Sequence, residues 1–71
     1  MKYSETIVKH ANDVIHETNF RSIASLDTSM RSISWDIESL LNCNEIDLVA
    51  VNELNTLYSA LSNIKAARKE L

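Results

Sequence analysis

The side chains best suited to chemistry lie close together near the start of the chain. On a helix, His10, Asp13 and Glu17 would lie within about 60° of one another. Imidazole and carboxylate groups together can ligate a divalent metal. Di-iron bundles need Glu-x-x-His on each of two helices, and the chain offers one near match, from Asp13 to His16. A metal-binding helical bundle using His10, Asp13 and Glu17 is one hypothesis, and a solvated polar face is the simpler interpretation.

The chain has one cysteine, Cys43, in a polar segment between two apolar series. A single cysteine cannot form an internal disulfide, and no Cys/His set has the spacing of a zinc site. Because Asn42 and Asn44 flank it and acidic residues follow, Cys43 is interpreted as a loop residue of ordinary reactivity.

The 71 residues include no glycine and no proline. Glycine supplies the positive φ that tight turns need, and proline interrupts helices. Their absence excludes P-loops, dinucleotide-binding fingerprints and nucleophile elbows, all of which depend on glycine. The composition therefore predicts one all-α domain over residues 1–71 that is not an enzyme and has no cofactor or metal.

Two segments show the alternating three- and four-residue spacing that places apolar side chains on one helix face. The first series is Ile23, Leu26, Met30, Ile33, Ile37 and Leu40. The second series is Ala50, Leu54, Leu57, Leu61, Ile64 and Leu71. Such series favour the antiparallel packing of a helical hairpin or bundle.

The second of these helices is predicted to cover about residues 45–70. Asn44 is a good N-cap, and Asp47 would place negative charge in the first turn, where the helix dipole favours it. The last turn carries the positive charge that a C-terminus prefers, on Lys65, Arg68 and Lys69.

The first third of the chain is helical but out of phase, and two interpretations remain open. In one, the helix breaks near residues 18–22, with Asn19 or Ser22 capping a new helix, which gives a three-helix bundle. In the other, one helix covers about 4–42 with a stutter. The absence of a strong stop signal in residues 16–22 favours the long helix.

A long helix would extend beyond its hairpin partner and leave apolar side chains uncovered, namely Ile7, Val8, Val14 and Ile15. A second subunit would then cover them, so we expect a homodimer that forms an antiparallel four-helix-type bundle. Stripes of small polar residues, such as Ser22, Ser25, Ser29, Ser32 and Ser39, are either solvated or allow close helix approach across that interface.

Several large apolar side chains lie off the main apolar series. Trp35 either closes the end of the core, against Leu48 and Val51, or serves as a binding anchor, because tryptophan and tyrosine are enriched at interface hot spots. The candidate contact residues are Phe20, Trp35, Val51 and Tyr58, with an acidic rim of Glu38, Glu45, Asp47 and Glu53.

The formal net charge of −3 is mild, and nucleic-acid binding needs a basic stripe. A transcriptional or nucleoid modulator contacting DNA through the basic end of the last helix is therefore an alternative, but nucleic acid is an unlikely partner. No apolar stretch approaches the roughly 20 residues of a membrane span, and no signal peptide is recognised, so we expect a cytoplasmic protein with no membrane contact.

The sequence thus predicts a small non-enzymatic protein that presents a helical surface to another protein, as a modulator, inhibitor or adaptor. Its expected partners are a second copy of itself and another protein.

Overall fold

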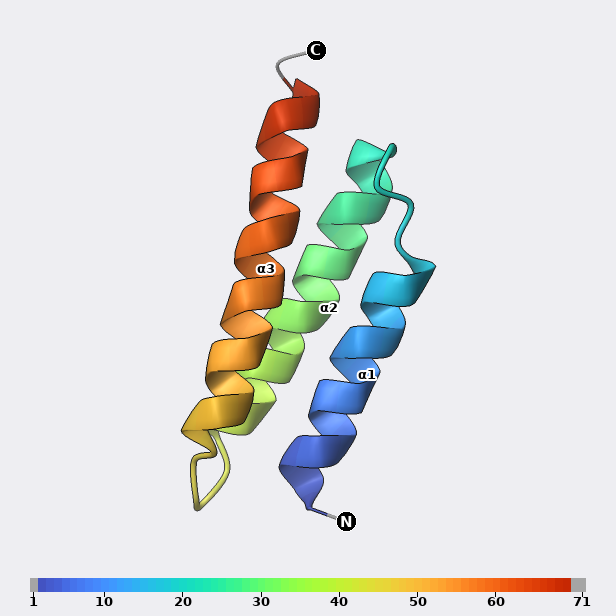
Figure 1. The fold of residues 1–71 in the computed structure, drawn as a ribbon. Helices are drawn as coiled ribbons and strands as arrows, with labels where there is room; N and C mark the ends of the chain where they lie inside the picture. The colour runs from blue at the N-terminus through green and yellow to red at the C-terminus, as the bar shows by residue number, and fades with distance from the viewer. Residues whose placement is uncertain (1, 70–71) are drawn as a thin grey trace.

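The computed structural model describes residues 2–69, which form three helices. They are α1 (Tyr3–Glu17), α2 (Ile23–Leu41) and α3 (Leu48–Lys69). The chain reverses direction at each connection, so α1 and α3 run the same way and α2 runs opposite to both (Figure 1). α2 packs most closely against α3, less against α1, and α1 touches α3 least. The all-α class is confirmed, as a three-helix bundle.

The core is built mainly from the two predicted apolar series. Its five largest fully buried side chains come from α2 and α3: Leu26, Ile33, Leu40, Leu54 and Leu61. These residues recur at intervals of seven within each helix, so the antiparallel pair buries them along one continuous seam. From α1, Ile7 and Ala11 complete the core.

The single helix over 4–42 is wrong, because the chain leaves α1 at Thr18. Thr18 has an extended backbone, and its buried hydroxyl donates to the Val14 carbonyl at 2.7 Å. The side chain of Asn19 then accepts from the backbone N–H of Arg21, as in an Asx turn. Ser22 caps α2 by accepting from the N–H of Ser25 at 3.2 Å.

Short polar side chains therefore make this corner without glycine. Within residues 2–69, no residue has a positive φ. The Ser25 hydroxyl adds a further bond, accepting from the backbone N–H of Asn19 at 2.9 Å. The predicted alternative, a break near 18–22 with Ser22 as a cap, is confirmed.

The corner changes what covers the apolar face of α1. Ile7 is buried, and Val8, Val14 and Ile15 are half-buried against the core of the same chain. A second subunit is not needed to cover these side chains, so the reason given above for a four-helix dimer no longer holds.

α3 begins three residues later than predicted and ends at Lys69, with residue 70 outside the described part of the chain. Asp47, not Asn44, is the N-cap: its Oδ1 accepts from the N–H of Ala50 at 3.2 Å, and its carbonyl accepts the first helical bond, from Val51. Ser4 of α1 holds the other carboxylate oxygen by a 2.9 Å hydrogen bond. This contact with α1 favours Asp47 over Asn44 as the cap.

Candidate protein-interaction surface

Trp35 lies on the outer side of α2, where 71% of its surface is exposed. It does not close the core against Leu48 and Val51, because α1 and α3 complete the core on the other side of the helix. A shallow hollow of about 480 Å³ lies beside it, between α2 and α3. We call its lining the Trp35 surface: Asp27, Met30, Arg31, Ser34, Trp35, Glu38, Tyr58 and Lys65.

An ion pair crosses this surface and joins the two helices. Lys65 Nζ lies 2.5 Å from Asp27 Oδ1, with 24% and 37% of the two side chains exposed. The hydrogen bond from Lys65 lowers the pKa of the Asp27 carboxyl below its ordinary value of 3.8, and the positive charges of Lys65, Arg31 and Lys69 add to this effect. Asp27 and Lys65 therefore neutralise each other.

Arg31 and Glu38 differ from that pair, because both are exposed and, within residues 2–69, neither forms an ion pair. They lie one helical turn before and one turn after Trp35. The Trp35 surface thus has an exposed indole at its centre and an unpaired charge of each sign on either side.

The structure separates the other predicted contact residues. Tyr58 is half-buried and lies on the Trp35 surface. Phe20 is 40% exposed in the α1–α2 corner, more than three helical turns away along α2. Val51 is only 8% exposed and belongs to the core. Val51 is therefore wrongly placed among the surface contacts.

The predicted acidic rim is also divided. Glu38 borders Trp35, and Glu45 is exposed in the α2–α3 connection. Asp47 and Glu53 instead line a groove between α1 and α3. The backbone N–H of Ala50, with the hydroxyl of Ser4, lowers the pKa of Asp47. Asp47 is therefore a structural cap and not a free acidic contact.

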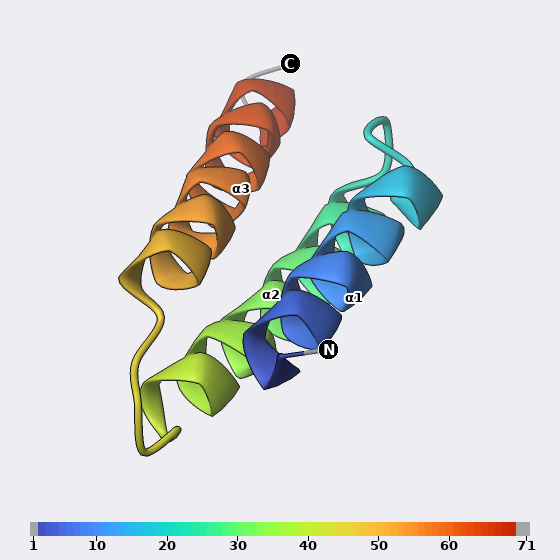
Figure 2. The ribbon, with the colours of Figure 1, turned by 60° about the horizontal axis from the view of Figure 1, so that its bottom comes forward.

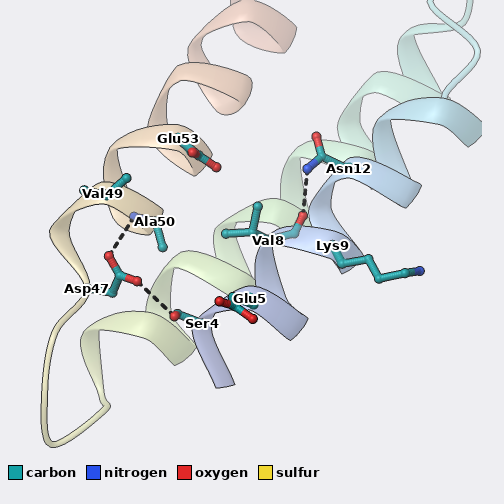
Figure 3. A pocket seen from close by; sticks show the side chains of 9 residues that line it. All are labelled: Ser4, Glu5, Val8, Lys9, Asn12, Asp47, Val49, Ala50 and Glu53. Carbon is teal, nitrogen blue, oxygen red and sulfur yellow. Dashed lines mark hydrogen bonds between the residues drawn. The ribbon is translucent and has the colours of Figure 1, made fainter. Parts of the chain in front are cut away.

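The α1–α3 groove has a volume of about 490 Å³, and Figure 3 shows the side chains that line it. Val8, Val49 and Ala50 form its apolar part, and Glu5, Lys9 and Glu53 lie around it. Figure 2 shows that α1 and α3 lie apart from each other, whereas α2 packs against both. The groove lies on a different face from Trp35.

The residues of the metal hypothesis do not meet. His10 Nδ1 lies 2.6 Å from Asp36 Oδ2 of α2, and Asp13 pairs with Lys9 at 3.0 Å. Among residues 2–69, no group of three or more histidine, cysteine, aspartate or glutamate side chains is arranged to hold a metal. The polar residues of α1 instead form a contact with α2, through His10, and an ion pair within α1, through Asp13.

The basic end of α3 is partly engaged within the bundle. Lys65 pairs with Asp27, and the Arg68 Nε donates to the carbonyl of Phe20 at 3.2 Å. Of the three basic residues named for DNA contact, only Lys69 has no such bond within residues 2–69. This arrangement does not favour a nucleic-acid interface.

Sequence reasoning missed two features that depend on the third helix. Neither the Asp27–Lys65 pair nor the role of Arg31 beside Trp35 follows from helix periodicity, because each requires knowing which side of α2 stays exposed.

Cys43 is half-buried in the predicted loop, and its thiol donates to the Ser39 carbonyl at 3.3 Å. This contact agrees with a structural role.

Within the described residues, no helix has both the length and the apolar character that crossing a bilayer requires. No protein-family model matches the chain, and no curated protein or solved structure is significantly similar to it.

Proposed function

We propose that this chain is a small non-enzymatic interaction protein that binds another polypeptide through the Trp35 surface. The observation that carries the proposal is the exposure of the Trp35 indole, at 71%. Indole is among the most costly side chains to leave in water and is enriched at binding hot spots.

The surroundings of Trp35 support this use. Met30, Ser34 and Tyr58 provide a shallow, mixed floor beside the ring, and charged groups surround it. An apolar centre with a polar rim is the usual anatomy of a protein interface. The surface belongs to two packed helices, so binding would not require it to order first.

The test is capture of polypeptides by the tagged protein, in its native host's lysate and with an untagged copy of the chain, before and after nuclease treatment. We expect a stoichiometric, nuclease-resistant polypeptide that binds the wild type and is lost with Trp35→Ala. Tyr3→Ala is the matched control, because Tyr3 is 60% exposed but lies outside the Trp35 surface.

Circular dichroism would establish that both variants keep the wild-type helix content. Equal capture by the wild type and Trp35→Ala, or no retained polypeptide of either kind, would contradict the proposal. Partners that disappear on nuclease treatment would favour the DNA hypothesis instead.

A further inference from the structure

The outer side of α2 carries a row of exposed residues whose charges would complement those of the same row in a second copy. Six exposed residues recur from the first turn of α2 to its C-cap at alternating spacings of four and three: Ala24, Thr28, Arg31, Trp35, Glu38 and Asn42. Spacing of this kind keeps side chains on one face. Their exposure shows that neither α1 nor α3 covers this face, which we call the outer stripe of α2.

The charges of the outer stripe are arranged about its middle. Arg31 lies four residues before Trp35, and Glu38 lies three residues after it. A two-fold axis near Trp35 would relate two antiparallel α2 helices. Arg31 of each copy would then lie opposite Glu38 of the other copy, which gives two such contacts. In such an isologous contact, residue i meets residue j and residue j meets residue i.

From this charge complementarity, we infer that the polypeptide bound at the Trp35 surface is a second copy of this chain, with the two α2 helices antiparallel. The inference rests on the proposed function. A parallel pair would oppose Arg31 to Arg31 and Glu38 to Glu38, and like charges at an interface are repulsive. The charge pattern therefore selects the antiparallel arrangement.

The remaining residues of the outer stripe are compatible with this arrangement. The two Trp35 rings approach each other near the axis, beside the small side chain of Ser34. Ala24 and Thr28 are short enough to let the helix backbones come close. The negative charge of Asp27 at the edge of the stripe is already paired with Lys65, at 2.5 Å.

This dimer differs from the four-helix assembly expected from the sequence. The expectation from the sequence was based on Ile7, Val8, Val14 and Ile15, which pack in or against the core of their own chain. Each copy would contribute the face of one 19-residue helix, so we expect the buried area to fall below the roughly 1,200–2,000 Å² of a standard interface. We therefore expect a reversible dimer whose population depends on concentration.

The first experiment measures molecular mass by sedimentation equilibrium from about 1 μM to about 1 mM, a range that brackets micromolar association. We expect a shift from one chain to two. Trp35 is the only tryptophan of the chain. Its fluorescence emission therefore reports on this surface alone, and it should move to shorter wavelength as dimer forms.

The second experiment exchanges the charges. Arg31→Glu and Glu38→Arg should each weaken self-association by about tenfold, because each reversal turns two attractive contacts into repulsive ones. An equimolar mixture of the two variants should associate more tightly than either alone, since every cross-contact is then between opposite charges. Arg21→Glu and Glu53→Arg are the matched controls, with the same changes of charge outside the outer stripe, and should leave dimerisation unchanged.

A wild-type chain that stays monomeric across the whole range would overturn this inference. So would a dimer whose affinity is indifferent to both charge reversals, or a mixture that associates no better than its components. The proposed function can fail separately from the dimer. A monomer that captures a different protein in a Trp35-dependent way would contradict the dimer but not the proposed function. The absence of any Trp35-dependent capture would contradict both.

Discussion

The hydroxyl groups of Thr18 and Ser29 lie 2.5 Å apart and tie the end of α1 to the first half of α2. Both side chains are buried, at 8% and 6% exposure. Because Thr18 donates its own proton to the Val14 carbonyl, Ser29 is the donor in the bond between them. This is the only hydrogen bond between buried side chains that the structure shows within residues 2–69, and it fixes the corner against the core.

Removing that bond should destabilise the bundle. We expect Ser29→Ala to lower the free energy of unfolding by about 1 kcal/mol, the typical net value of a hydrogen bond. Urea denaturation would measure it. Ser59→Ala, at an exposed position of α3, is the control for the higher helix propensity of alanine. Equal stability of the two variants would contradict the assigned role of Ser29.

The burial of Val51 can be separated from the exposure of its neighbour. Val51 is 8% exposed and Val49 is 69% exposed, although both lie in the first turn of α3. Val51→Ala should cost about 1–3 kcal/mol of stability by leaving a cavity, whereas Val49→Ala should stay within about 0.5 kcal/mol. Thermal and chemical denaturation would compare them, and a reversed order would show that Val51 faces solvent.

The Asp47 cap should make stability depend on pH in the acid range. Its pKa in the folded chain lies below the ordinary 3.8, because the N–H of Ala50 and the hydroxyl of Ser4 bind the carboxylate. A carboxyl with a depressed folded pKa stabilises the fold above its unfolded pKa and loses that contribution as pH falls through the folded pKa. Stability should therefore decline below about pH 4.

Asp47→Asn isolates this effect, because asparagine also caps helices but does not titrate. The free energy of unfolding of Asp47→Asn should vary less with pH than that of the wild type between about pH 4 and pH 2. Asp27→Asn provides a comparison at the second carboxyl whose pKa is lowered. If Asp47→Asn and wild type lose stability in parallel, Asp47 does not carry the predicted linkage.

The ion pair between Asp27 and Lys65 can be tested through the pKa of the Asp27 carboxyl. Lys65→Met should raise the pKa of Asp27 toward its ordinary value, because the hydrogen bond from Lys65 is the main cause of its depression. NMR titration of the Asp27 carboxyl carbon would measure the shift. Lys69→Met should change this pKa less, since Lys69 acts only through its charge. A larger effect from Lys69 would indicate a different pairing.

The seam of the bundle was predictable because it follows from periodicity alone. Leu26, Ile33 and Leu40 repeat every seven residues, and Leu54 and Leu61 do the same, so any helical packing of the chain buries them together. The corner was harder, because Thr18 and Asn19 are also tolerated inside helices. They act as a turn only once Ser25 and Ser29 of the next helix supply hydrogen-bond partners.

The start of α3 and the candidate surface depended on the tertiary fold. Asn44 and Asp47 are both good N-caps, and Ser4, 43 residues away from Asp47, binds only the latter. The sequence is compatible with Trp35 as either a core or a binding residue and does not separate these alternatives. The position of α1 decides between them, because α1 and α3 leave the outer side of α2 open.

The three helices do not contribute equally to the packing of the bundle, because α1 leaves through a polar corner and contacts α3 only weakly. α1 adds two buried side chains to the core, whereas α2 and α3 share the rest. Local opening follows the least-packed elements. Detachment of α1 would leave the α2–α3 hairpin in place. The amide protons of α1 should therefore exchange with deuterium earlier than those around Ile33 and Leu54. The chain would then behave as a hairpin with a separable first helix, whose release removes the α1–α3 groove and exposes the core side chains of α2 and α3 that α1 covers.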